Sequence, residues 1–286
     1  MSDAGVKVEP LSPILIEPAV RNALAEDLGR GGDLTTDIVI DDDAWVKASI
    51  NARQVGALSG IDIAEMTFAL LDPRVDMEVY IADGGRVAPG DTVALLEGPA
   101  RAILTGERVA LNYMGHLSGI ASETRKIVDA VAGTKARITC TRKTTPGLRA
   151  FEKYAVRCGG GFNHRFGLDD GLMIKDNHIA ACGGITQAIE RAKSKVGHMV
   201  KIELEVDNLN QLEEGLKAGA DVILLDNMGP DLLKEAVKMI DGRAVAEASG
   251  GVTLETAPAI AASGVDVISV GWLTHSAPCL DLGLDF

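Results

Sequence analysis

The sequence predicts an α/β fold, with a mixed α+β region first and a barrel-like or doubly wound parallel sheet after it. Short strands separated by turn-forming residues fill the first part of the chain, whereas the second part repeats an apolar run followed by a helical stretch. The later runs recur every ~20–30 residues, the spacing of successive βα units. With 286 residues and 47% apolar side chains, the chain is long enough to bury a substantial core.

The first elements are marked by periodicity and by the residues that end them. Apolar residues at helical spacing predict a helix over Pro18–Leu28, which Gly29 ends. Residues Ala44–Ala52 alternate between apolar and polar side chains, as in a half-buried strand. A second helix over Ile61–Leu71 stops before Asp72–Pro73, because proline disfavours helical backbone in the residue before it.

Three further strands and a long helix complete the first part. Turn signals bound the segments Met77–Ile81, Thr92–Glu97 and Ala100–Leu104, which we predict as short strands. Over Thr105–Ala132 the apolar residues fall on one stripe of a helix, and Gly133 is suited to end it. We expect this helix to link the two parts of the chain.

Six short apolar runs in the second part indicate buried parallel strands, which are near-continuously apolar because both faces of the sheet are covered. Each run leads into a polar residue or a glycine. The runs are Arg137–Cys140, Leu172–Ile174, Val200–Leu204, Val222–Leu225, Ala244–Ala246 and Val267–Val270. Six units predict a barrel-like or doubly wound sheet and fall short of the eight of a complete TIM barrel.

Composition and charge narrow the functional classes. A net charge of −13 disfavours nucleic acid and anionic membranes as partners, and 3% aromatic residues offer no base-stacking platform. None of the four cysteines forms a CxxC pair, so we expect ordinary thiols in a reducing compartment. The N-terminus lacks the pattern of a secretory signal, and no apolar run could span a bilayer. We therefore expect a cytoplasmic protein.

Cations are concentrated between Lys135 and Lys175, where nine Lys or Arg residues are accompanied by three acidic residues. In an acidic protein, such a cluster fits a site for a small, highly charged anion. A basic surface patch would have the same composition, so charge alone leaves both interpretations open.

Charged and small residues follow the predicted parallel strands, at the edge where ligands of α/β folds bind. They are Arg142, Lys143, Lys175, Glu205, Asp226, Ser249 and Gly271. Several ionisable groups at successive strand ends favour an active site over isolated structural ion pairs, because burying unpaired charge is costly. The Ser249–Gly250–Gly251 and Val270–Gly271 loops are candidate phosphate grips, since glycine lets backbone N–H groups approach phosphate oxygens.

These residue types leave several chemical roles open. Glu205 and Asp226 offer hard oxygen ligands for Mg²⁺, or they pair with Lys143 and Lys175 and bind no metal directly. Either lysine could form a Schiff base, as in an aldolase, or could hold pyrophosphate. The His164–Arg165 pair suits a carboxylate or another anion, and its alternative is an arginine paired with an acid of its own chain.

Eight motifs, in order along most of the chain, resemble those of the quinolinate phosphoribosyltransferases, the nicotinate-nucleotide pyrophosphorylases of NAD synthesis. The motifs are EDLGRGGDLTTD (26–37), GERVALNYMGHLSGIAS (106–122), TRKTTPGLR (141–149), GGGFNHRFGLDDGLMIKDNHI (159–179), IELEVDN (202–208), ILLDN (223–227), EASGGV (247–252) and SVGWLTHS (269–276). Each short motif alone is weak evidence, whereas the ordered series is highly specific.

The resemblance implies a fold and an assembly. It implies an N-terminal α/β sandwich domain over residues 1–115 and an incomplete, six-stranded α/β barrel over residues 116–271. We expect residues 272–286 to pack back on the first domain. The family is normally dimeric, so the resemblance also implies a homodimer or a higher oligomer of dimers, in which an arginine at position 108 completes the partner's active site.

The resemblance further implies a reaction: decarboxylating transfer of a phosphoribosyl group from phosphoribosyl pyrophosphate to quinolinate, which gives nicotinate mononucleotide, pyrophosphate and CO₂. The residues implied to bind the substrate carboxylates are Arg108, Arg142, His164 and Arg165. The catalytic residues implied around the ribose, the pyrophosphate and Mg²⁺ are Lys143, Lys175, Glu205 and Asp226, the last two as metal ligands. The residues implied to hold the 5′-phosphate are Ser249, Gly250, Gly251 and Gly271.

Two residues depart from the pattern of the family, and a third, a histidine, has an expected structural role. Trp272 stands beside a phosphate grip where the family usually has a small residue, and Asp169 stands where an uncharged residue is expected. His178 is expected to cap or orient the loop after Lys175. Two alternatives to the implied reaction remain: another barrel phosphate enzyme, such as an aldolase or a related phosphoribosyltransferase, and a non-catalytic anion-binding protein.

Overall fold

The computed structural model describes residues 8–286, which divide into two compact units. The first unit contains the residues up to 125 together with 145–160 and 276–286, and the second contains 126–144 and 161–275. A single helix, α4 (Ala100–Ala130), belongs to both, so the expected division after residue 115 falls inside a continuous helix. Within residues 8–286, no helix is both long and apolar enough to cross a membrane.

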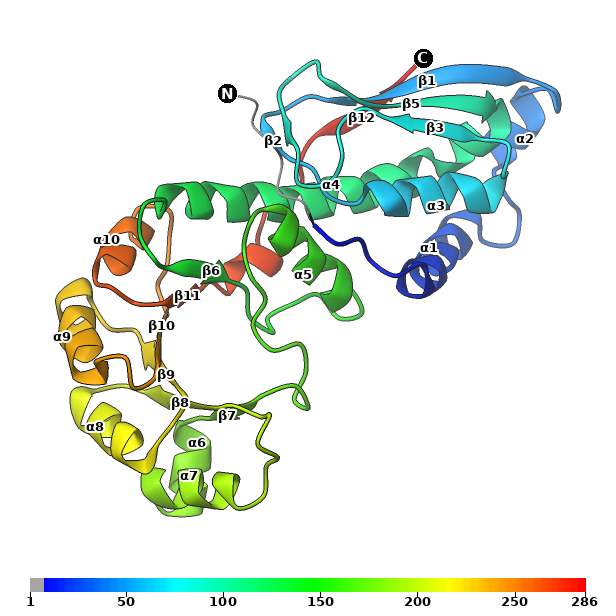
Figure 1. The fold of residues 1–286 in the computed structure, drawn as a ribbon. Helices are drawn as coiled ribbons and strands as arrows, with labels where there is room; N and C mark the ends of the chain where they lie inside the picture. Colours follow the sequence, from blue (N-terminus) through cyan, green and yellow to red (C-terminus); the bar gives the residue numbers. More distant parts are fainter. Residues whose placement is uncertain (1–7) are drawn as a thin grey trace. The chain divides into compact units, whose positions relative to one another are not determined.

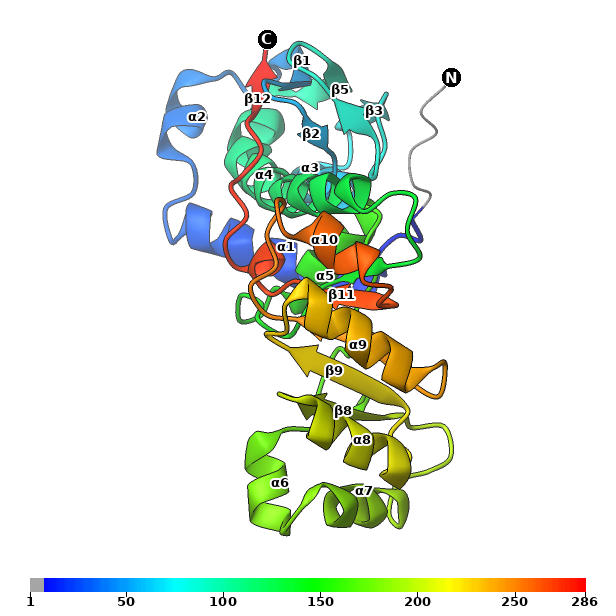
Figure 2. The same cartoon turned by 90° about the vertical axis from the view of Figure 1, so that its left-hand side faces the viewer.

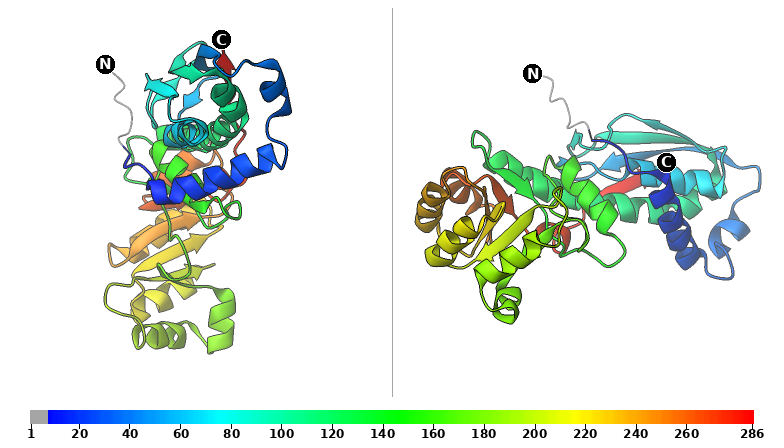
Figure 3. Two further views of the ribbon diagram at one scale, coloured as in Figure 1. Left: turned by 90° about the vertical axis from the view of Figure 1, so that its right-hand side faces the viewer. Right: turned by 60° about the horizontal axis from the view of Figure 1, so that its bottom comes forward.

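A four-stranded antiparallel sheet is the centre of the first unit. Its strands lie in the order β12 (Leu282–Asp285), β1 (Trp45–Ala52), β5 (Thr92–Pro99) and β3 (Asp76–Val79). Helix α3 (Ile61–Leu71) and the first part of α4 lie along one face of this sheet (Figure 1, Figure 3). Ile50, Phe68 and Leu96 belong to the buried core of this unit.

The remaining elements of the first unit are short strands and three helices. They are β2 (Gly56–Ala57), which pairs with β4 (Arg86–Val87), and the helices α1 (Pro13–Leu28), α2 (Leu34–Val39) and α5 (Arg149–Cys158). Helix α1 starts five residues before the expected position and ends where expected, at Gly29 with φ 53°.

The C-terminal segment packs on α4 through two glycines spaced four residues apart. A Cβ at Gly119 would lie 2.0 Å from the Pro278 carbonyl oxygen, and one at Gly115 would lie 3.1 Å from the Leu280 carbonyl oxygen. The Leu280 N–H donates to the Gly115 carbonyl over 2.9 Å. Only glycine permits such close approach of a helix and a neighbouring backbone, after which the chain enters β12 and pairs antiparallel with β1.

A six-stranded parallel sheet is the centre of the second unit. Its order is β6 (Arg137–Thr139), β11 (Val267–Ser269), β10 (Val245–Ser249), β9 (Val222–Asp226), β8 (Ile202–Val206) and β7 (Leu172–Ile174). Strands β6 and β7 are the two edges, so the sheet curves without closing (Figure 1). The prediction of an α/β protein with an incomplete, six-stranded barrel is confirmed.

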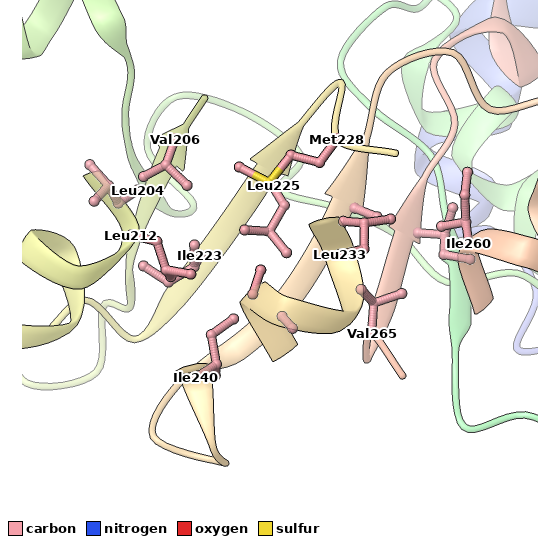
Figure 4. Close-up of a cluster of buried hydrophobic side chains, with 14 of the residues drawn as sticks. Leu204, Val206, Leu212, Ile223, Leu225, Met228, Leu233, Ile240, Ile260 and Val265 are labelled. Atoms are coloured by element: carbon pink, nitrogen blue, oxygen red, sulfur yellow. The ribbon is translucent and has the colours of Figure 1, made fainter. Parts of the chain in front are cut away.

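Helices cover the outer face of this curved sheet, as Figure 1 and Figure 2 show for α8 and α9. The helices are α6 (Asp176–Cys182), α7 (Ile185–Lys193), α8 (Leu209–Ala218), α9 (Pro230–Ile240) and α10 (Ala257–Ala262), followed by the 3₁₀ turn η1 (Trp272–Thr274). Leu204 and Ile223 of the strands belong to one buried core with Leu212 and Leu233 of the helices (Figure 4). Because strand side chains alternate, the residues between these apolar ones face the inside of the sheet.

Two expectations about the strands are wrong. Ala100–Leu104 is the start of α4 and not a strand, because Ala100 and Ile103 are buried one helical turn apart. Strands β8, β9 and β10 continue past the predicted apolar runs, so that Glu205, Asp226 and Ser249 lie within strands and not after them. A charged residue fits inside such a strand when its side chain faces a polar cavity. The rule that buried parallel strands are apolar throughout therefore does not hold for these strands.

Candidate active site

One cavity of about 880 Å³ lies at the carboxyl ends of the parallel strands and is lined wholly by residues of the second unit. Its lining includes eleven of the twelve residues singled out from the sequence: Arg142, Lys143, His164, Arg165, Lys175, Glu205, Asp226, Ser249, Gly250, Gly251 and Gly271. The twelfth, Arg108, lies on α4 in the first unit, where its guanidinium pairs with Glu107 over 2.6 Å. The structure therefore brings together residues that span more than 100 positions of the sequence.

The loop after β6 places Lys143 in the cavity wall. The Lys143 N–H donates to Thr141 Oγ1 over 3.0 Å, and the hydroxyl of Thr274, after β11, donates to the Lys143 carbonyl over 2.8 Å. A Cβ at Gly271 would lie 3.0 Å from Lys143 Cδ. Because Gly271 has no side chain, the side chain of Lys143 can pass next to it and extend into the cavity.

A bridge to β6 positions the loop that carries His164 and Arg165. The Phe162 N–H donates to the Ile138 carbonyl over 2.8 Å, which adds Phe162 as a short parallel partner beside β6. The Arg165 guanidinium then donates from Nη1 to the Gly171 carbonyl over 2.8 Å. These two attachments hold the loop at its start and across its turn.

The guanidinium groups of Arg142 and Arg165 form a cationic wall. Burial and the positive charge of Arg142 lower the pKa of Arg165, whereas the carboxylates of Glu203 and Asp170 act in the opposite direction. Arg142 Nε is buried and has no hydrogen-bond partner among residues 8–286. Two like charges and an unsatisfied donor in one wall are suited to an anionic ligand, because such a ligand supplies the missing acceptor and the opposite charge.

Lys175 and Glu205 form an ion pair across neighbouring strands, since Lys175 follows β7 and Glu205 lies on β8. The Lys175 N–H donates to His178 Nδ1 over 3.0 Å, which caps the start of α6. The expectation that His178 caps the loop after Lys175 is confirmed. The cap fixes the backbone from which the lysine side chain extends to the carboxylate.

The loop after β10 is shaped by its contact with the end of β9. Gly250 has φ 90°, and a Cβ there would lie 2.1 Å from Asn227 Oδ1. Asn227 itself has φ 53°, its N–H donates to the Ser249 carbonyl over 2.8 Å, and its amide donates to Asp226 Oδ2 over 2.7 Å. Gly250 and Gly251 (φ 60°) both have left-handed backbone, which glycine adopts readily, and the missing side chains leave their N–H groups accessible to a phosphate.

Trp272 joins the two glycine loops. Its indole N–H donates to the Val252 carbonyl over 2.9 Å, and both residues line the cavity. The ring is therefore tied to the loop after β10 while its own backbone belongs to the loop after β11. The sequence alone left open whether this large side chain narrows the pocket or packs outward, and the structure places it in the cavity wall.

Two buried glutamates, Glu203 and Glu247, were not predicted as site residues; they are 8% and 4% exposed. Both lie within hydrogen-bonding or ion-pairing range of His164 Nε2. The alternation within IELEV places Glu203 on the same strand face as Glu205, and this pattern is the signal that could have found it. Asn227, another lining residue, could have been noticed as the residue after a strand-end aspartate.

The cavity lining is suited to anionic ligands and to a cation. Lysines and arginines line it, the two glycine loops offer backbone N–H donors, and the Glu205 and Asp226 carboxylates come from neighbouring strands. Mg²⁺ is commonly bound by one or two carboxylates together with substrate phosphates, so this pair fits a magnesium ion.

Comparison with known proteins agrees with this geometry. The model of the quinolinate phosphoribosyl transferase N-terminal domain matches residues 33–118, and that of the C-terminal domain matches residues 120–285. A probable nicotinate-nucleotide pyrophosphorylase (carboxylating) of Bacillus subtilis is 46% identical over 275 residues, which cover 96% of this chain and 94% of the relative. The crystal structure of NadC from Streptococcus pyogenes superposes with a TM-score of 0.94 at 41% identity, covering 97% of this chain and 98% of the other.

Both domain models match in order and together span most of the chain. A nicotinate-nucleotide pyrophosphorylase (carboxylating) of Mycobacterium leprae is also 44% identical over 274 residues, 93% of this chain and 95% of the relative. The resemblance noted from eight short motifs is thus confirmed along the chain, and the protein belongs to the quinolinate phosphoribosyl transferase family.

Proposed function

We propose that this protein transfers the phosphoribosyl group of phosphoribosyl pyrophosphate to quinolinate, with loss of one carboxylate, and so makes nicotinate mononucleotide for NAD synthesis. The observation that carries the proposal is the single cavity in which eleven of the residues singled out from the sequence meet. Family membership and the names of the relatives support the same reaction.

The cavity offers complementary regions for the two substrates. Arg142, His164 and Arg165 form a wall for the two quinolinate carboxylates, because guanidinium groups match carboxylates in charge and shape. The loops Ser249–Gly250–Gly251 and Val270–Gly271 suit the 5′-phosphate, since their backbone N–H groups can approach its oxygens.

Bond formation to the ribose is the first step. The quinolinate ring nitrogen attacks the ribose C1 while the bond from C1 to the pyrophosphate oxygen breaks, and positive charge develops on the sugar. Lys143 and Lys175 lie where they can stabilise the leaving pyrophosphate, and Glu205 or Asp226 can stabilise the sugar cation. Glu205 and Asp226 would hold Mg²⁺, which would further neutralise the charge of the pyrophosphate.

Loss of CO₂ follows from the charge created in the first step. The ribosylated ring nitrogen is positive, so it stabilises the electron pair that stays on the adjacent ring carbon when the carboxylate departs as CO₂. That carbon then takes a proton from solvent and gives nicotinate mononucleotide. Arg142 and Arg165 contribute by holding the dicarboxylate in place until the nitrogen has reacted.

The proposed function also includes a homodimer. Arg108 is exposed on α4, with a side chain 61% accessible, and does not line the cavity of its own chain. A homodimer in which Arg108 of each chain reaches the other chain's cavity would add a third guanidinium to the carboxylate wall. We also propose that the enzyme works in the cytoplasm.

The proposal is tested by mixing the purified protein with phosphoribosyl pyrophosphate, Mg²⁺ and either quinolinate or nicotinate. Nicotinate mononucleotide, followed by ultraviolet absorbance, and pyrophosphate should form with quinolinate and not with nicotinate. K143A, prepared in parallel, controls for contaminating activity. Turnover of nicotinate alone would point to a related phosphoribosyltransferase, and a lysine adduct trapped by borohydride would point to an aldolase.

A further inference from the structure

Two buried carboxylates lie deeper inside the curved sheet than the predicted active-site residues of the same strands. Glu203 precedes Glu205 by two positions on β8, and Glu247 precedes Ser249 by two positions on β10, so each faces the inside of the sheet at a deeper level. Both side chains are at least nine-tenths buried. Ionisable groups in such positions are costly unless a neighbour compensates their charge.

The neighbour that both carboxylates share is His164, which can donate a hydrogen bond to them. Its Nε2 atom lies 3.2 Å from Glu203 Oε2 and 3.5 Å from Glu247 Oε1. Its Nδ1 atom accepts a hydrogen bond from the Arg165 backbone N–H over 2.8 Å. An Nδ1 atom that accepts carries no hydrogen, so the ring hydrogen is on Nε2 and points to the carboxylates.

His164 therefore connects the buried layer to Arg165. Glu203 hydrogen-bonds with the ring at Nε2, Glu247 lies within ion-pairing range of the same atom, and Nδ1 accepts from the backbone amide of Arg165. Glu203 also acts on Arg165 directly, because its negative charge opposes the repulsion between Arg142 and Arg165. The pair of guanidiniums can thus stay close together before any anion binds.

We infer that Glu203 and Glu247 are positioning residues for the dicarboxylate wall: by holding His164 from beneath, they set the placement of Arg165 toward quinolinate. The inference rests on the proposed function, because it assumes that Arg142 and Arg165 bind the substrate carboxylates. This positioning role can be distinguished from a purely electrostatic effect of the two negative charges on anion binding. Removing a negative charge beneath a cationic wall would strengthen anion binding by electrostatics alone, whereas loss of positioning weakens it.

Equilibrium binding of quinolinate, measured by calorimetry without turnover, separates these two effects. E203M and E247M keep the side-chain volume and remove the carboxylate that lies against His164 Nε2, and each should weaken quinolinate binding on the order of ten- to a hundredfold. E203Q retains an oxygen that can accept from Nε2 and should recover part of the affinity. Binding of phosphoribosyl pyrophosphate should stay within about threefold of wild type in all of them.

A double-mutant cycle shows whether the effect passes through His164. E203M combined with H164Q should bind quinolinate no more weakly than H164Q alone, because residues that act in one chain of contacts are not additive. E213Q, on an exposed helix surface where Glu213 pairs with Lys217, is the matched control and should bind quinolinate like wild type. Wild-type affinity or tighter binding in E203M and E247M would overturn the inference, and so would losses that add to that of H164Q.

One measurement needs no variant of the glutamates. The ¹⁵N spectrum of histidine-labelled protein, with His164 assigned through H164Q, should show a bare Nδ1 and a protonated Nε2. A ring that carries its hydrogen on Nδ1 would contradict the inference even if a glutamate variant failed to fold. If wild-type protein binds no quinolinate at all, the proposed function fails, and this outcome is distinct from equal binding by wild type and variants.

Discussion

Gly271 lies so close to Lys143 that a β-carbon built on the glycine would be 3.0 Å from the lysine Cδ. The neighbour is a flexible side chain, so G271A should leave the fold intact and displace the lysine from its path into the cavity. We expect kcat/KM to fall on the order of tenfold, because small displacements of catalytic groups are costly. Urea unfolding should stay within about 0.5 kcal/mol of wild type. G197A, where nothing lies within 4 Å of the added carbon, should keep wild-type kinetics.

The two glycines of the loop after β10 differ in a way that substitution can reveal. G250A places a β-carbon 2.1 Å from Asn227 Oδ1 in left-handed backbone, whereas G251A has the same kind of backbone and open space. We expect G251A to lose about 1 kcal/mol of unfolding free energy and G250A at least about 2 kcal/mol. Phosphoribosyl pyrophosphate should also bind more weakly to G250A. Equal losses in the two variants would show that the contact with Asn227 is unimportant.

The fluorescence of Trp272 should change when a ligand binds in the cavity. The chain has only two tryptophans, and Trp45 lies 53% exposed on β1 in the first unit. In W45F, the remaining fluorescence should change when phosphoribosyl pyrophosphate binds, because Trp272 lines the cavity. W272F loses the hydrogen bond to the Val252 carbonyl, and loss of ~1 kcal/mol should raise KM for phosphoribosyl pyrophosphate about fivefold. An unaltered spectrum in W45F at saturating ligand would count against this placement.

The titration of Glu247 should make the free energy of unfolding decrease as pH rises. Burial, together with the negative charge of Glu203, raises the pKa of Glu247 from its ordinary value near 4.5 to about 7. The folded protein thus binds this proton more tightly than the unfolded chain, and the resulting stabilisation is complete below pH 4.5 and lost as pH rises through about 7. Urea unfolding between pH 5 and pH 8 should show a shallower decline in E247Q than in wild type. E213Q should follow wild type, because the pKa of exposed Glu213 is lowered and its effect lies below this window.

Subunit mixing tests whether Arg108 serves the partner's cavity. R108A and K175A proteins should each be inactive alone if the proposed dimer is correct. After random exchange of equal amounts, half of the dimers are mixed, and each mixed dimer has one intact site of two. Activity should therefore recover to about a quarter of wild type. Absence of recovery, with subunit exchange demonstrated by a size tag, would contradict the shared site.

Most of the cavity residues could be predicted from the sequence because parallel strands obey a simple geometric rule. Lys175, Asp226 and Ser249 follow or end apolar runs, and carboxyl ends of parallel strands meet at one edge. The same rule hid Glu247, because an acidic residue after an apolar run looks like the end of a strand, and it gave no reason to single out Glu203 inside the predicted run Val200–Leu204.

Local patterns also failed where neighbouring context decides the element. Ala100–Leu104 is short and apolar, and only its continuity with the following helix makes it helical. The close approach of Gly119 to Pro278 could not be foreseen, because it joins residues far apart in the sequence whose contact no local pattern records.

The position of β12 has a consequence for how the protein is made. This strand pairs with β1 and so belongs to the first sheet, yet the entire parallel sheet precedes it along the chain. A ribosome therefore delivers every strand of the second unit before the antiparallel sheet can gain its last edge strand. Until then β1 exposes an unpaired edge, the kind of surface through which nascent chains associate wrongly.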